Sequence, residues 1–162
     1  FKGTVEENLK MAKPDATKEE MEAVLQKVNL LGFLQTQDGL QTQLLEKASN
    51  LSGGQCQRLV IARALLRTDS AVYIFDEAAS NIDVESEELI MNVIHELAKT
   101  KTVLLISHRL ANVVKSDKIY FLKDGEIKES GKHDELMSQN GAYRHLYESQ
   151  MALENYGKGG VA

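Results

Sequence analysis

Two short, uninterrupted apolar segments constrain the fold of this chain more than any other feature of its sequence. The first runs from Ala71 to Phe75 and stops at Asp76-Glu77. The second runs from Thr102 to Ile106 and stops at Ser107-His108. Continuous apolar runs of this length are typical of strands in a parallel sheet covered on both faces, and the stretch 84–99 between them has the length and periodicity of a crossover helix. The sequence therefore predicts a βαβ unit.

The segments before and after this unit predict helices and a hairpin. Thr4 and Thr17 each stand three residues before a glutamate, the spacing of a capping box, and apolar residues at helical period follow Thr17. We therefore expect the first fifty residues to be mainly helical. Residues 118–129 form two strand-like runs around an Asp-Gly turn, which indicates a β-hairpin. Two short helices are expected to follow, from His133 and from Ala142.

The composition indicates one soluble globular domain. Of the 162 residues, 43% are hydrophobic and 27% charged, and one proline with no Gly/Ser tract gives no sign of a linker. We expect one domain over 1–156, mainly helical over 1–70 and strand-bearing over 71–156, with a frayed tail over 157–162. The expected fold class is α/β, with an incomplete parallel sheet flanked by helices and a C-terminal β-hairpin and helices.

Charge and cysteine content argue against several classes of function. A formal net charge of -5 offers no overall attraction to nucleic acid or anionic lipid, so any phosphate must be held locally. No stretch approaches the roughly 20 consecutive apolar residues that a membrane span requires. The single cysteine, Cys56, excludes an intramolecular disulfide and a cysteine-based zinc site, and it agrees with a reducing, cytoplasmic setting. We assign Cys56 no role.

Polar side chains follow both predicted strands. In open α/β sheets the ligand lies beyond the carboxyl ends of the strands, so Asp76, Glu77, Ser107 and His108 should line one edge. Two adjacent carboxylates suit two duties there, one positioning Mg²⁺ and the other orienting an attacking water. Such a pair can also simply end a strand and cap the next helix, and the pair taken alone favours this second interpretation.

A second candidate element is the segment Leu51-Ser52-Gly53-Gly54-Gln55, which precedes apolar residues at helical spacing. Ser52 and Gln55 have capping-box spacing, and the glycines allow backbone N–H groups to approach an anion closely. The helix dipole would add to these amides, so a terminal phosphate could bind there with little help from lysine or arginine. Since Ser-Gly-Gly is a common string, an ordinary loop-to-helix junction is the alternative.

The order and spacing of four segments resemble those of ATP-binding-cassette ATPases. Segment 51–55 looks like the signature motif, 74–77 like Walker B, 80–83 like the D-loop and 107–109 like the switch-histidine region. Residues 1–8 resemble the stretch that follows the Q-loop in exporter-type members. The resemblance extends to about Tyr147, and a chance coincidence of four ordered motifs is far less probable than a chance match to any one.

The resemblance implies an ATPase that works with ATP and Mg²⁺ as a head-to-tail homodimer or heterodimer of nucleotide-binding domains. Each nucleotide would lie between one subunit's phosphate loop and the other subunit's signature helix. A transmembrane domain of the same polypeptide would place the protein at the cytoplasmic face of the cell membrane, with no nucleic acid as partner. The transported substrate cannot be deduced, because transmembrane helices would select it.

The same resemblance assigns roles to individual residues. By position, Asp76 would hold Mg²⁺, Glu77 would act as the catalytic carboxylate and His108 would contact the γ-phosphate. Asp83 would lie at the subunit boundary and couple the two sites. The partner's γ-phosphate would be bound by four successive residues: Ser52, Gly53, Gly54 and Gln55.

The sequence contains no Gly-x-x-x-x-Gly-Lys-Ser/Thr string. In the family this phosphate loop lies upstream of the position that matches Phe1, so we expect the chain to be a C-terminal part of the domain that is inactive by itself. Loss of the loop's strand would also expose apolar sheet edges, which favours self-association. Smaller departures from the family pattern are Ala79, Asn81, and Ala48 where exporter relatives often have glycine.

Two other hypotheses stay open at this point. One is a soluble cassette ATPase that is not coupled to transport; long coiled-coil insertions would favour it, and the sequence has none. The other is a non-catalytic module that donates its signature motif to a complete partner in trans.

Overall fold

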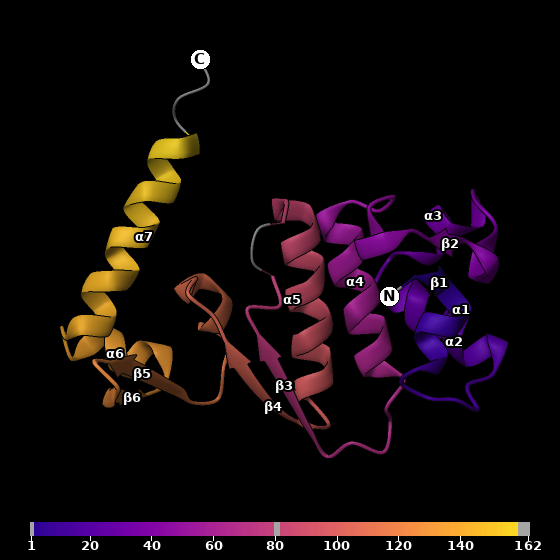
Figure 1. Ribbon diagram of the computed structural model, residues 1–162. Coiled ribbons are helices and arrows are strands. Elements are labelled where there is room, and N and C mark those ends of the chain that lie inside the picture. Colours follow the sequence, from indigo (N-terminus) through magenta and orange to yellow (C-terminus); the bar gives the residue numbers. More distant parts are fainter. Residues whose placement is uncertain (1, 80–81, 159–162) are drawn as a thin grey trace. The chain divides into compact units, whose positions relative to one another are not determined.

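The computed structural model describes residues 2–79 and 82–158, with the side chains of 47 and 156–158 left aside. The chain divides into two compact units, Phe1–Ile106 and Ser107–Ala162, and each is described by itself (Figure 1). Among the described residues, no helix is both long and apolar enough to cross a membrane.

The N-terminal part of unit 1 is mainly helical, as predicted. Its elements in chain order are β1 (Gly3–Thr4), α1 (Val5–Lys10), α2 (Lys18–Lys27), α3 (Leu31–Gln35), the 3-10 helix η1 (Gly39–Gln41), β2 (Gln43–Leu44), the 3-10 helix η2 (Glu46–Ala48) and α4 (Gly53–Leu65). Strands β1 and β2 pair antiparallel. Thr4 and Thr17 both form complete capping boxes, with Glu7 and Glu20, which explains where α1 and α2 begin.

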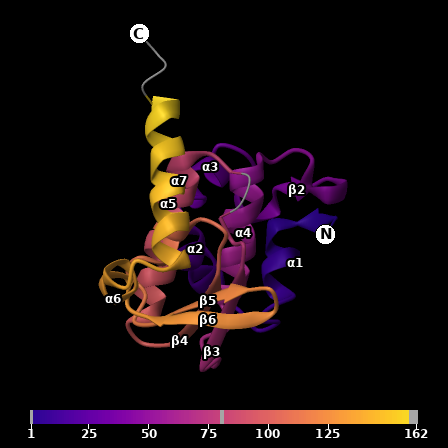
Figure 2. The ribbon, with the colours of Figure 1, turned by 90° about the vertical axis from the view of Figure 1, so that its left-hand side faces the viewer.

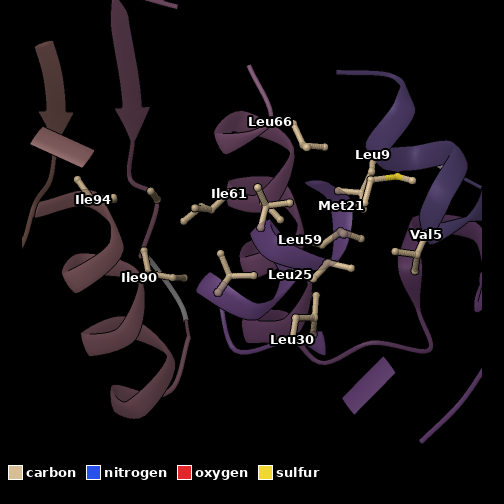
Figure 3. Close-up of a cluster of buried hydrophobic side chains, with 14 of the residues drawn as sticks. Val5, Leu9, Met21, Leu25, Leu30, Leu59, Ile61, Leu66, Ile90 and Ile94 are labelled. Atoms are coloured by element: carbon tan, nitrogen blue, oxygen red, sulfur yellow. The ribbon is translucent and has the colours of Figure 1, made fainter. Parts of the chain in front are cut away.

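Apolar side chains of α1, α2, α4 and α5 (Val84–Ala98) form the core of unit 1. Figure 3 shows α4 contributing the middle of this cluster, with Ile61 facing the Ile90 and Ile94 side and Leu59 facing Leu25 and Met21. All of these side chains are buried, and each contributes about 1.5–3 kcal/mol by leaving water. The position of α4 is therefore fixed from both sides.

The predicted βαβ unit is confirmed. Strand β3 (Val72–Asp76) pairs parallel with β4 (Thr102–Ile106), in a register that places Val72 opposite Thr102 and Asp76 opposite Ile106. Helix α5 connects them, beginning after Asp83, whose side chain accepts a hydrogen bond from the Ser86 N–H. The α/β fold class, with a short parallel sheet and flanking helices, is thus observed.

The prediction that both faces of this sheet are covered is wrong for the described residues. Tyr73 and Phe75 point into the core and are 7% and 6% exposed, whereas Val72 and Ile74 are 55% and 65% exposed. Leu104 and Ile106 of β4 are exposed as well. The sequence misleads here because an apolar run shows that a strand suits a covered position, not that some element of the same chain covers it.

Unit 2 contains the predicted hairpin and helices. Its elements are the 3-10 helix η3 (Leu110–Val113), β5 (Ile119–Lys123), β6 (Glu126–Gly131), α6 (His133–Ser138) and α7 (Ala142–Lys158). Asp124 and Gly125 both have positive φ, as a tight hairpin turn requires, and Figure 2 shows β5 and β6 side by side. Buried Tyr143 of α7 packs edge-on against Phe121.

The expected tail over 157–162 can be compared with the structure only at its start. Positions 157 and 158 close α7, and residues 159–162 lie outside the described range. The subdomain boundary between residues 70 and 71 stays a prediction.

Candidate functional site

The carboxylates Asp76 and Glu77 stand at the end of β3, as predicted. Asp76 is exposed and, by strand alternation, lies on the open face together with Ile74. The N–H of Glu77 donates to the Ile106 carbonyl at 2.9 Å, so main-chain hydrogen bonding to β4 continues one residue beyond the strand. The main chain therefore fixes the position of Glu77.

Glu77 also has an unusual backbone conformation. Its φ of +49° lies in the left-handed region, which costs a residue with a side chain about 1–3 kcal/mol. Such outliers concentrate at functional sites, where the surrounding structure holds them in place. This geometry is compatible with a functional interpretation of the pair.

The carboxylates at this strand end could hold a Mg²⁺ ion only if other molecules supply most of its ligands. Among the described residues there is no group of three His, Cys, Asp or Glu side chains that could hold a metal by itself. Mg²⁺ commonly takes only one or two protein carboxylates and completes its octahedron with water and phosphate oxygens. Asp76 suits such a role, in which a nucleotide would bring the metal's other ligands.

The start of α4 forms the predicted capping box at Ser52. The Gln55 N–H donates to Ser52 Oγ at 3.2 Å, and the Ser52 N–H donates to Gln55 Oε1 at 2.9 Å. Both side chains thus use an acceptor atom for the cap, which leaves the Ser52 hydroxyl proton and the Gln55 NH₂ as donors. The N–H groups of Gly53 and Gly54 lie in the first turn, where a helix gives them no partner. Four donor groups therefore gather at the positive end of a 13-residue helix.

Gly54 is required because α4 and α5 approach each other closely at their N-terminal ends (Figure 1). Gly54 is buried, and a Cβ atom there would lie 2.5 Å from Ser86 Oγ, 3.0 Å from Ser86 Cβ and 3.0 Å from Asp83 Oδ2. The structure thus brings together two sequence-predicted site residues, Gly54 and Asp83. Ser86 fills the space between them, and the sequence analysis did not identify it as a site residue. Its position three residues after the helix cap Asp83 was the one sequence feature that could have indicated it.

Asp83 interacts chiefly with the start of α5. Its carboxylate accepts the Ser86 N–H at 2.8 Å. This hydrogen bond, then the one from the Ser86 hydroxyl, and to a smaller extent the charge of Arg58, hold the pKa of Asp83 below its usual value. The side chain is therefore ionised at neutral pH.

Arg58 ties α4 to the loop that follows α2. Its Nη1 donates to the Asn29 carbonyl at 3.0 Å, and its Nε donates to the Gly54 carbonyl at 3.3 Å. Asn29 has a φ of +50°, a conformation that asparagine tolerates better than most residues. Arg58 thereby helps to set the orientation of the first turn of α4.

His108 belongs to unit 2, where it is exposed. Its carbonyl accepts a hydrogen bond from Gln150 Nε2 at 2.8 Å. Ser107 stabilises the same segment locally, because its Oγ accepts the Arg109 N–H at 3.1 Å. Glu77 lies in unit 1, so each of the two predicted catalytic residues is placed within its own unit.

Part of the predicted D-loop falls outside the description. Residues 80 and 81 are not described, whereas Ala79 before them is buried and Asp83 after them caps α5. Position 1 is likewise outside the described residues.

Comparisons with known proteins agree with the motifs. The sequence profile of the family described as "ABC transporter" matches residues 2–80. An "Uncharacterized ABC transporter ATP-binding protein" of Haemophilus influenzae is 53% identical over 95% of this chain and 27% of its own length. An "ATP-dependent lipid A-core flippase" of Mannheimia succiniciproducens is 44% identical over 93% of this chain and 26% of its own length.

A solved structure, "Structure of a bacterial Atm1-family ABC exporter with ATP bound", superposes with a TM-score of 0.84 at 30% identity, covering 93% of this chain and 26% of that one. The chain thus spans about a quarter of the length of the relatives it matches.

Proposed function

Because the chain belongs to the ATP-binding-cassette transporter family, we propose that it forms part of the ATP-hydrolysing domain of a membrane exporter, in which hydrolysis drives transport. The observation that carries the proposal is the donor cluster at the start of α4, where exposed Ser52 and Gly53 and half-buried Gln55 each offer a donor group and no basic side chain is among them. Such a cluster suits the terminal phosphate of a nucleotide, since the helix dipole and the amides act together.

In this proposal the strand end and the helix start serve different nucleotides. Glu77 orients the attacking water and Asp76 holds Mg²⁺, which supplies charge stabilisation at the phosphates when bound. His108 contacts a γ-phosphate. The donors from Ser52 to Gln55 bind the γ-phosphate that the partner domain holds, so each site needs two chains.

Two features favour this division between chains. The sequence contains no Gly-x-x-x-x-Gly-Lys-Ser/Thr string, so it offers no cradle for the β- and γ-phosphates. The start of α4 nevertheless keeps its donors. We therefore expect the chain alone to show no significant ATP turnover, and we expect it to contribute its helix start to a site completed by another domain. Donation in trans without any catalysis is the second candidate function.

Mixing two inactive variants tests the proposal. In a chimera, this chain replaces the matching part of the H. influenzae relative, of which it spans 27%. One variant carries Glu77→Gln and the other Ser52→Arg, which places a bulky cation at the start of α4. Each should be inactive alone, whereas a mixed dimer contains one site with an intact Glu77 and an intact opposing helix start.

Partial recovery of Mg²⁺-dependent ATPase activity on mixing is the expected result. Activity of unmixed Glu77→Gln would contradict the catalytic role of Glu77. A lack of recovery, with dimers present by sedimentation, would contradict the site shared between chains.

A further inference from the structure

We propose that Gln150 of α7 is a positioning residue for His108, and that it holds the main chain on both sides of Arg109 in the conformation that presents the histidine. The proposal rests on the role of His108 proposed above. It adds a residue that lies 42 positions further along the chain and carries no ionisable group.

The side-chain amide of Gln150 makes two hydrogen bonds to the main chain of this segment. Gln150 Nε2 donates to the His108 carbonyl at 2.8 Å, and the Leu110 N–H donates to Gln150 Oε1 at 2.9 Å. The amide therefore pairs with the backbone as a neighbouring strand would, using one donor and one acceptor. Because it engages residues 108 and 110 together, it restrains the backbone dihedrals between them.

A second contact from the same helix reaches the residue between these two. Arg109 Nη2 lies 2.7 Å from Glu154 Oε1. Glu154 follows Gln150 by four residues, so both side chains lie on one face of α7. This ion pair is partly exposed and adds little stability, but it indicates that three consecutive residues of the histidine segment meet the same helix face.

Helix α7 is itself anchored within unit 2, so it can serve as a reference for the segment. The Glu129 carboxylate of β6 accepts the Ala142 N–H at 2.6 Å, which caps the start of α7. The Tyr143 ring is fully buried, and its hydroxyl lies 2.8 Å from His133 Nδ1. The hairpin and α6 thus fix the position of α7. Because Gln150 lies on α7, its hydrogen bonds hold residues 108 and 110 in a fixed position relative to that helix.

Loss of these two hydrogen bonds should change geometry more than stability. Residue 108 is exposed, so water can replace the lost partner at its carbonyl, and that bond makes only a modest net contribution to folding. Leu110 is buried, so leaving its N–H without an acceptor costs about 1–3 kcal/mol, less than the stability of a typical domain. Catalytic groups are more sensitive, since a displacement of about 1 Å can cost on the order of a hundredfold in rate. The variant Gln150→Met keeps the size and apolar stem of the side chain and removes both bonds.

Amide hydrogen exchange in the chain measures the contact directly. In Gln150→Met the Leu110 amide should exchange at least about tenfold faster, because its acceptor is gone, while the amides of the β5–β6 hairpin keep their rates. Gln139→Met is the matched control: Gln139 is exposed at the end of α6, and its replacement should leave Leu110 exchange unchanged. Unchanged Leu110 exchange in Gln150→Met would overturn the proposal.

ATPase kinetics of the chimera measure the consequence. Gln150→Met should lower kcat about tenfold and leave the KM for ATP within about twofold, because the histidine acts on the transition state. In a His108→Ala background, Gln150→Met should cause no further loss. An additive loss, or a kcat equal to that of Gln139→Met, would overturn the positioning role.

The same measurements distinguish the positioning role of Gln150 from the catalytic role of His108 on which it rests. If His108→Ala leaves kcat unchanged, the proposed role of His108 is wrong, and the positioning role of Gln150 in catalysis falls with it. Faster Leu110 exchange in Gln150→Met would then still establish the contact.

Discussion

Glu77 and His108 are held in place by different kinds of interaction. Glu77 follows β3, and its N–H continues the main-chain pairing with β4. The segment of His108 is held by side chains, from Ser107 beside it and from Gln150 more than forty residues away. The first arrangement survives any side-chain substitution that leaves the strand intact, whereas the second can be undone by one substitution. Variants at the two places should therefore fail in different ways.

The largest effect is expected from Glu77→Gln in the chimera. The variant keeps the size of the side chain and the main-chain hydrogen bond to Ile106, but it removes the carboxylate proposed to orient water. Steady-state ATPase activity should fall by about a hundredfold or more, the range typical of losing a general base. Thermal unfolding of the variant should match that of the parent. Normal turnover would show that Glu77 only ends a strand.

The next effect is on stability, in Gly54→Ala. Alanine normally favours a helix over glycine by about 1 kcal/mol, but here its Cβ would clash with Ser86 and Asp83. We expect a net loss of about 1–3 kcal/mol in the free energy of unfolding, measured by urea denaturation, since the start of α5 must move.

Gly32→Ala is the matched control. Gly32 lies in α3, and no described atom outside its own helix turn comes within 4 Å of the place that a Cβ would take, so alanine should raise stability there. Equal gains in both variants would show that the starts of α4 and α5 are not tightly packed.

A smaller effect is expected on the stability of the fold at low pH. The lowered pKa of Asp83 means that its hydrogen bonds to Ser86 stabilise the fold above the usual aspartate range, and that this contribution is lost as the pH falls through the depressed value. Asp83→Asn keeps the helix cap and cannot titrate. Between neutral pH and pH about 3, the urea midpoint of the variant should therefore fall less than that of the parent. Parallel pH profiles would contradict the assignment.

The smallest effect is expected at Ala48, which shares the left-handed backbone of Glu77 with a φ of +53°. No catalytic role is assigned to Ala48, so glycine should relieve its strain at no functional cost. We expect Ala48→Gly to raise the free energy of unfolding by about 0.5–1 kcal/mol. Ala23→Gly, at an exposed position of α2, should lower it by about 1 kcal/mol. Destabilisation by both changes would show that residue 48 is unstrained.

The sequence was informative wherever a local pattern determines the structure. Capping boxes at Thr4, Thr17 and Ser52 mark helix starts because cap and partner are only three residues apart. The two strands and the helix between them were also predictable, since hydrophobic periodicity and length identify them.

Long-range arrangements were not predictable from one sequence. The open face of β3 and β4 depends on which elements pack there, and nothing in the apolar run from Val72 to Phe75 records that. The pairing of Gln150 with residues 108 and 110 has no local signal, because glutamine is common on helix surfaces. Ser86 escaped notice for a similar reason. The roles of the site residues stay predictions until the variants are measured.

The close approach of α4 and α5 has an electrostatic consequence. Two helices that begin side by side bring two positive dipole ends together, and each would attract a phosphate if left uncompensated. The first turn of α5 carries Glu85 and Glu87 and is capped by Asp83, whereas the first turn of α4 carries no acidic residue. Glu85 and Glu87 thus screen the start of α5, whereas the start of α4 has only the Asp83 carboxylate beside it, at Gly54, so the start of α4 keeps more of its attraction for an anion.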